Sequence, residues 1–214
     1  MLSVVDFASV SSFFIVFCFS GVEKSTIKAP SDLTSYRKQV KKGRQFIEFN
    51  RMQISSVRQL FCIYKNPKLD LRQEPDVCFV GELGADMGGP KKEFFYRAIQ
   101  SLCIVDPLYN LQLFGGVDGH LVPLYGVDAI SEGLFEIAGK IVAHSVLHGC
   151  DGFVGLSPAV VKYIETGSVT KAEQFVTTED LPDIELRNII ESKVGYFKKL
   201  NNINYVPVAN SFYL

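Results

Sequence analysis

Residues 77–95 read VCFVGELGADMGGPKKEFF and contain two different hydrophobic patterns separated by glycines. The β-rich run at residues 77–80 follows Pro75-Asp76 and stops at Gly81, which predicts a short buried strand. Six apolar residues then recur every four positions as adjacent pairs, which predicts a helix with a broad buried face: Phe94, Phe95, Ala98, Ile99, Leu102 and Cys103. Residues 81–89 therefore predict a turn from a strand into a helix.

Helical patterns dominate the sequence on both sides of this stretch. Before Asn66-Pro67, four apolar residues form one stripe at helical spacing: Val57, Leu60, Phe61 and Tyr64. Ser157-Pro158 is typical of a helix start and Gly167 of a helix end, and residues 181–192 carry a further amphipathic pattern. The fold class expected is mainly helical α+β, with a few short strands.

The most apolar helix candidate spans residues 134–147. It contains Ala138, Gly139 and Ala143, small residues that would let a neighbouring helix approach closely. Glycine lowers helix propensity, so its presence here favours a packing role.

Length and charge exclude several classes of protein. The 214 residues are 47% hydrophobic and carry 22 basic and 23 acidic side chains. This is enough apolar material for one sizeable core and argues against a disordered chain. A net charge of −1 gives no general electrostatic footprint for nucleic acid, so we expect no nucleic-acid partner.

The cysteines and the N-terminal segment bear on the compartment. Five cysteines without a C-x-x-C pair predict free thiols in a reducing environment. Four of them lie in apolar runs or on a predicted core face, where thiols are usually inert: Cys18, Cys62, Cys78 and Cys103. Residues 13–19 are apolar, but residues 1–12 lack the basic residues of a signal peptide, and the run is far below the ~20 residues needed to cross a bilayer. We expect a cytoplasmic or nuclear protein with no membrane association; an N-terminal signal peptide is the alternative.

Residues 22–51 form a basic segment, with eight basic and three acidic side chains. Such a run is typical of a solvated face or a linker. A patch that binds an acidic partner is the alternative interpretation.

Two motifs that suggest chemistry fail on inspection. The glycines of residues 81–89 are followed by Pro90-Lys91-Lys92 rather than by the Lys-Ser/Thr of a phosphate-binding loop, and Pro90 lacks a backbone N–H. Gly155-Leu156-Ser157 resembles a nucleophile elbow only weakly, because Pro158 cannot donate to an oxyanion. We interpret residues 81–89 as a structural turn and Ser157 as a helix cap. In this turn we expect Gly88 and Gly89 to adopt the positive φ that β-branched residues tolerate poorly.

Two further groups are also better explained by structure. His144 and His148 share a helix face, but Ser145 stands where a zinc helix has glutamate, and no third ligand follows at a typical spacing. At a helix end, His148 suits the negative end of the dipole. Cys150 follows His148 and precedes Asp151, and sequence neighbours are rarely posed as a nucleophile and its base. We therefore assign no metal ligand and no catalytic residue.

Residues 77–95 resemble the signature of HECT-type ubiquitin ligases. In that family a strand, a G-E-x-G-x-D-x-G-G turn and a helix with a basic-Glu-Phe-Phe start open the large subdomain of the N-lobe. Residues 134–149 are similar to the next long helix of the family, and Leu156-Ser157-Pro158 and the acidic residues 179–183 continue the match in order. The resemblance covers about residues 44–195. Asp86 in the turn and Glu93 in the first helical turn suit scaffold roles.

The sequence departs from the family after residue 192. In the family, a small subdomain that docks the ubiquitin-conjugating enzyme and a C-lobe with the thioester cysteine follow this point. Here residues 193–214 contain no cysteine. We expect three parts: an apolar segment and basic linker at residues 1–43, a HECT N-lobe-like domain at residues 44–195, and a truncated tail at residues 196–214.

The resemblance implies a part in ubiquitin transfer to protein, with a ubiquitin-conjugating enzyme, ubiquitin and a protein substrate as partners. Transthiolation needs only a reactive thiolate and positioning, so it implies no metal or organic cofactor. Because the thioester cysteine has no match here, we expect the chain to be inactive alone. The alternative is a catalytically empty HECT-like binding or regulatory module that uses basic residues 22–51 or acidic residues 173–191. A hydrolase built on Ser157 or Cys150 is disfavoured.

Overall fold

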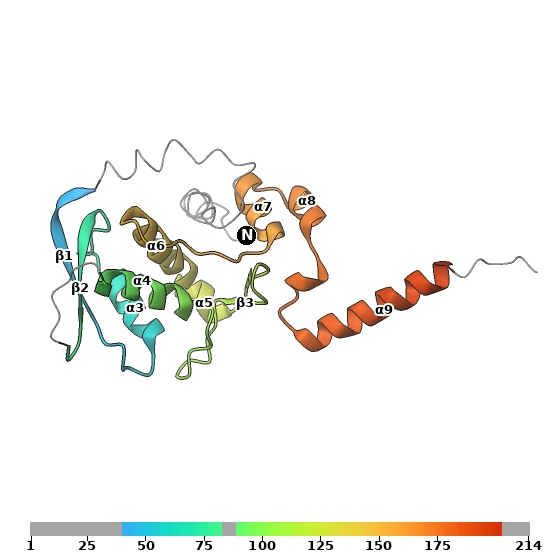
Figure 1. The fold of residues 1–214 in the computed structure, drawn as a ribbon, viewed down its shortest axis with the longest axis horizontal. Helices are drawn as coiled ribbons and strands as arrows, with labels where there is room; N and C mark the ends of the chain where they lie inside the picture. Colours follow the sequence, from blue (N-terminus) through green and yellow to red (C-terminus); the bar gives the residue numbers. More distant parts are fainter. Residues whose placement is uncertain (1–39, 83–88, 203–214) are drawn as a thin grey trace, which may run out of the picture.

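The computed structural model describes residues 40–82 and 89–202, which form a mainly helical α+β fold (Figure 1). The strands are short: β1 (Lys41–Phe49), β2 (Gln73–Phe79), β3 (Phe114–Gly115) and β4 (Val122–Pro123). The helices are α3 (Ser56–Lys65), α4 (Gly89–Ser101), α5 (Val127–Ser131), α6 (Leu134–Leu147), α7 (Pro158–Thr166), α8 (Val169–Ala172) and α9 (Ile184–Asn202). Two 3₁₀ turns, η2 (Glu173–Phe175) and η3 (Thr178–Asp180), precede α9. The expected fold class is confirmed at this level.

Strands β1 and β2 form a two-stranded parallel sheet, and β1 is not among the strands expected from the sequence. Only Ile47 and Phe49 of β1 are buried, and the strand begins with exposed basic residues, so its own sequence gives a weak signal. The pairing with β1 also extends β2 four residues before Val77, where the expected strand began. β1 starts at Lys41, three residues before the expected N-terminal limit of the domain.

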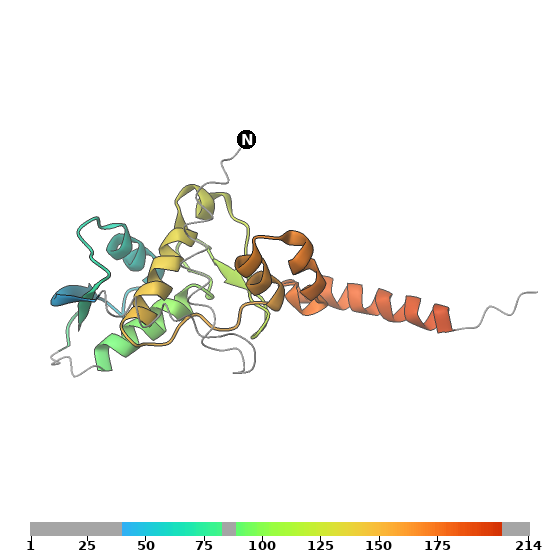
Figure 2. The same cartoon turned by 90° about the horizontal axis from the view of Figure 1, so that it is seen from above.

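Helices α3, α4 and α6 pack against one another beside the sheet and enclose the core (Figures 1 and 2). The predicted face of α4 is buried, with Cys103 beyond its end only half-buried. On α3 the predicted stripe is buried at Val57, Leu60 and Tyr64, while Phe61 is half-buried at its edge. The fold therefore places the two ends of the residue 77–95 stretch at the centre of the domain.

The predicted ends of α7 are confirmed. Ser157 is the N-cap, and its Oγ accepts a hydrogen bond from the backbone N–H of Ala159 at 3.1 Å. Gly167 ends the helix with a φ of 61°, the left-handed conformation that glycine adopts most readily.

One expectation for the turn is wrong. We expected Gly89 to need a positive φ, but it is the first residue of α4, its φ is not positive, and a Cβ there would meet no atom within 4 Å. Gly89→Val is therefore not expected to destabilise the domain through backbone strain. Gly88 and Asp86, for which we also expected turn roles, lie outside the described residues, as do residues 1–39.

Gly139→Leu tests the packing of α6. Gly139 is buried within a helix that packs against both α3 and α4. A leucine side chain there should overpack the core and lower the free energy of unfolding by about 1–3 kcal/mol in urea titrations followed by circular dichroism. Unchanged or increased stability would show that no neighbouring helix constrains this position.

Candidate functional site

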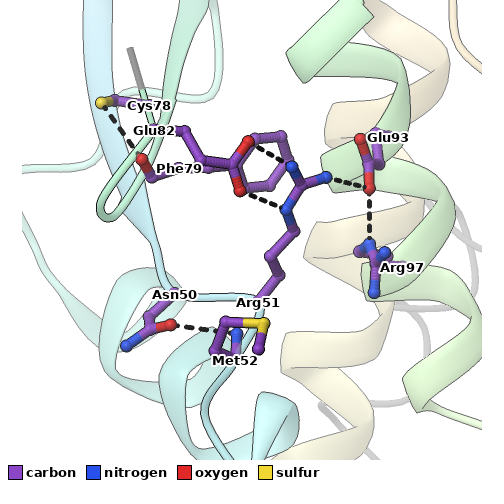
Figure 3. Close-up of polar contacts among 8 residues, drawn as sticks. All are labelled: Asn50, Arg51, Met52, Cys78, Phe79, Glu82, Glu93 and Arg97. Atoms are coloured by element: carbon purple, nitrogen blue, oxygen red, sulfur yellow. Dashed lines mark hydrogen bonds and ion pairs between the residues drawn. The ribbon is translucent and has the colours of Figure 1, made fainter. Parts of the chain in front are cut away.

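The turn that resembles the HECT signature is held at both ends by one arginine (Figure 3). Arg51, two residues after β1, forms a bidentate ion pair with Glu82, which lies three residues after the end of β2. Its Nη1 also donates to Glu93 Oε1 of α4 at 2.6 Å. The guanidinium lies 4.5 Å from the ring centroid of Phe79. Three residues of the signature thus contact one side chain. Phe79 lies in β2, Glu82 precedes the undescribed part of the turn, and Glu93 follows it.

The electrostatics of this cluster favour its ionised form. Glu93 accepts from Arg97 one turn further along α4 and from Arg51, and these bonds hold the pKa of Glu93 below its ordinary value. The Glu93–Arg97 spacing is visible in the sequence, but Arg51 is only one member of a basic run there. Its partners lie 31 and 42 residues away, and no local pattern connects them. We call Arg51, Phe79, Glu82, Glu93 and Arg97 the arginine clamp.

A double-mutant cycle tests the arginine clamp. Arg51→Met should lower the melting temperature, because it removes a cation that Glu82 and Glu93 share. Glu82→Gln should also lower it, but the two changes together should cost less than the sum of the single changes, since both remove the same ion pair. Additive losses in thermal melts would show that the pair is not coupled. The same cycle with Arg44→Met, an exposed arginine of β1, is the control.

A row of polar side chains, most of them buried, links α3, α6 and β2. The Tyr64 hydroxyl lies 2.9 Å from His144 Nδ1, and the ring centroids of His144 and His148 are 5.0 Å apart. His148 contacts Glu74 Oε2 through Nδ1 at 3.0 Å and the Leu71 carbonyl oxygen through Nε2 at 2.8 Å.

Glu74 is the outermost residue of this row of polar side chains. Lys91 donates to its other carboxylate oxygen at 2.5 Å. Burial alone would raise the pKa of Glu74, but the bonds from Lys91 and His148 hold it below its ordinary value. Loops, strand β2 and helices α3, α4 and α6 are therefore tied together by polar side chains.

Protein groups contact His144 through Nδ1 and His148 through both ring nitrogens. Burial lowers the pKa of His144 to about 3, with a smaller contribution from His148, so His144 is neutral at ordinary pH. Its Nε2 has no hydrogen-bond partner within the described part of the chain. No group of three or more metal-binding side chains is found in residues 40–82 and 89–202. This pair thus has a structural explanation in Tyr64, Glu74 and the Leu71 carbonyl.

Cys150 lies near these polar side chains, but they do not activate its thiol. Both nitrogens of His148, which could have served as its base, are bound elsewhere. Burial raises the pKa of the Cys150 thiol; the charge of Lys91 lowers it in part, and that of Asp151 raises it again. A thiol with a raised pKa is a poor nucleophile.

The other described cysteines differ in exposure. Burial raises the pKa of Cys103 to about 11, and Cys78 is half-buried in β2. We expected Cys62 to lie on an apolar, inert face, which is wrong: it is exposed, because Val57, Leu60 and Tyr64 turn the opposite side of α3 towards the core. Cys18 lies outside the described residues.

Ser157 faces an acidic residue rather than a histidine. Its side chain hydrogen-bonds to Asp180, and Asp180 Oδ1 lies 2.7 Å from His120 Nδ1. Burial would raise the pKa of Asp180, but the Thr177 N–H, His120 and Ser157 hold it below its ordinary value. Because Asp180 separates Ser157 from the imidazole, His120 is not placed to act as a base for the serine. Ser157 acts as a cap and as an anchor for η3.

His120 fixes the segment that leads into α9. Its Nε2 lies 2.7 Å from Glu179 Oε2, opposite the contact of Nδ1 with Asp180. The two contacts place the His120 ring between two carboxylates and so join residue 120 to η3. No sequence pattern singles out His120, since its partners lie some 60 residues further along the chain.

The described part of the chain holds no helix both long enough and apolar enough to cross a membrane. The charged and polar clusters found there join segments of the domain to each other. No protein-family model and no curated protein sequence matches the chain.

Proposed function

We propose that residues 44–195 are the large-subdomain portion of the N-lobe of a HECT-type ubiquitin-protein ligase, and that they serve as a scaffold in protein ubiquitination. The observation that carries this proposal is the arginine clamp. The signature residues Phe79, Glu82 and Glu93 are used to hold the strand–turn–helix junction together through Arg51. In this proposal the signature residues stabilise the fold of the N-lobe, and the reaction takes place in another lobe.

The proposed reaction proceeds by two acyl transfers. The thiolate of a ligase cysteine attacks the thioester between ubiquitin and the conjugating enzyme, which releases the enzyme's thiolate and leaves ubiquitin on the ligase. A substrate lysine amine then attacks that thioester and forms an isopeptide bond, and the departing ligase thiolate takes up the proton that the amine gives up. Residues 44–195 contribute positioning in this scheme, and the partners are the conjugating enzyme, ubiquitin and a protein substrate. The corresponding location is cytoplasmic or nuclear.

The cysteines of the described residues support a scaffold role. Cys103 and Cys150 have raised thiol pKa values, and both histidines nearest to Cys150 in the sequence are bound by other groups. A transfer cysteine must be exposed and close to its thiolate form. Cys62 is exposed.

A chimera tests the proposal. Residues 40–195 would replace the large subdomain of a characterised HECT ligase that keeps its own small subdomain and C-lobe. We expect the chimera to accept ubiquitin on the host cysteine as an adduct that dithiothreitol cleaves, and to lose the adduct when that cysteine becomes serine. A folded chimera that the conjugating enzyme cannot charge, beside a host ligase that it does charge, would contradict the proposal.

A catalytically empty binding module is the second candidate function. It is favoured by the exposed surface of residues 173–191, where Glu179 and apolar side chains such as Val176 and Ile189 face solvent. Failure of the chimera to accept ubiquitin, with the native chain still folded, would favour this module over the ligase scaffold.

A further inference from the structure

Helix α9 extends away from the rest of the described chain in both views (Figures 1 and 2). Its 19 residues correspond to a rod of about 28 Å. The helix is held near its start, where Arg187 donates to the carbonyl oxygens of Glu179 and Leu181 and Thr178 donates to Glu191. From residue 188 to residue 194 its side chains are exposed or half-buried.

The free surface of α9 is amphipathic. Leu186, Ile189 and Val194 are 44%, 55% and 43% exposed, and the half-buried Ile190 lies between them on the helix. At 3.6 residues per turn these four positions form one stripe. A helix that exposes such a stripe is more stable when another apolar surface covers it.

Charge along α9 is divided between its two ends. Its first half carries Glu185 and Glu191, preceded by Asp183, and its one cation, Arg187, is bound to backbone carbonyls. Residues 193–202 contain three lysines and no acidic residue. Two such helices side by side and antiparallel place the acidic half of each beside the basic half of the other, whereas a parallel pair places like charges together.

We propose that α9 is a self-association surface, on which the α9 helix of a second copy of this chain packs in antiparallel orientation across a two-fold axis near Val194. Glu191 and Lys198 are seven residues apart, which is close to two helical turns, so both positions lie on the same flank of the stripe. A two-fold axis near Val194 brings position 191 of one copy opposite position 198 of the other. The proposal does not depend on the ubiquitin-ligase assignment.

Sedimentation of the full 214-residue chain tests the apolar part of the interface. We expect a monomer–dimer equilibrium, and we expect Leu186→Glu or Ile189→Glu to weaken dimerisation by at least about tenfold. Asn188→Glu is the matched control, because it adds the same charge on the opposite side of the same helix and should leave dimerisation unchanged. Thermal melts would establish that all variants are folded. A wild-type chain that stays monomeric at all concentrations would overturn the proposal. It would do so even if that monomer bound some other protein or a lipid vesicle.

A charge-exchange experiment tests the orientation. Glu191→Lys and Lys198→Glu should each be more monomeric than wild type, because each homodimer then pairs like charges twice. A one-to-one mixture of the two variants should form a heterodimer, since both cross pairs then combine lysine with glutamate. The Glu191→Lys change also removes the hydrogen bond from Thr178, but this loss is the same alone and in the mixture. Absence of a heterodimer in the mixture would overturn the antiparallel arrangement.

Discussion

Phe94→Ala is expected to lower the free energy of unfolding by about 3–5 kcal/mol, because it opens a cavity in a close-packed core. Phe94 is fully buried where α4 meets the sheet, with its ring centroid 5.3 Å from that of Phe49 and 5.2 Å from that of Phe95. Alanine would leave a cavity between β1 and α4 that these rings cannot close without moving. Urea titrations followed by circular dichroism would measure the loss.

Tyr96→Ala is the matched control for this change. Tyr96 is an aromatic residue of the same helix, but its side chain is 64% exposed. Its removal should change stability by no more than about 0.5 kcal/mol. Equal losses of stability in the two variants would contradict the assignment of Phe94 to the buried face of α4 and of Tyr96 to its exposed face.

Lowering the pH from 7 to 5 is expected to cost about 2 kcal/mol of stability through His144 alone. In the unfolded chain this histidine has its ordinary pKa near 6.5, and in the folded protein burial lowers the pKa to about 3. Above pH 6.5 both states are neutral, and the histidine has no effect. Below it the unfolded chain binds a proton that the folded protein does not, so stability falls as the pH falls towards 3.

His144→Phe isolates this contribution. Phenylalanine fills a similar volume and does not titrate, while His120 and His148 remain in place. The variant should be less stable than wild type at pH 7, because the Tyr64 hydroxyl loses its partner, but its stability should fall less steeply between pH 7 and pH 5. Parallel pH profiles for the two proteins in urea titrations would show that His144 titrates as if exposed.

The parts of the fold that the sequence predicted are those encoded by neighbouring residues. The apolar period of α6 and the caps of α7 lie within single segments, and the structure has both as expected. Strand β1 was missed because Ile47 and Phe49 alone are too short a pattern. Its strand conformation depends on β2, which begins 24 residues after the end of β1.

The candidate site shows more strongly the same difference between features encoded by neighbouring residues and features that depend on distant ones. The Glu93–Arg97 pair follows from helical spacing, but Arg51 joins it only through the fold. His144 and His148 were correctly placed on one helix face, while their contacts with Tyr64 and Glu74 lie 80 and 74 residues away. Polar side chains of this kind have no periodic pattern, so their residue types can be read from the sequence but their partners cannot.

The scaffold assignment requires that this chain supports ubiquitin transfer without itself accepting ubiquitin. The most direct test is a non-reducing gel after the full chain is incubated with conjugating enzyme and labelled ubiquitin, with the chimera as a positive control in the next lane. We expect the dithiothreitol-sensitive adduct on the chimera and none on the native chain, with Cys150→Ala indistinguishable from wild type. An adduct on the native chain that dithiothreitol cleaves and that disappears in Cys150→Ala would contradict the scaffold assignment and make the chain a self-sufficient transferase.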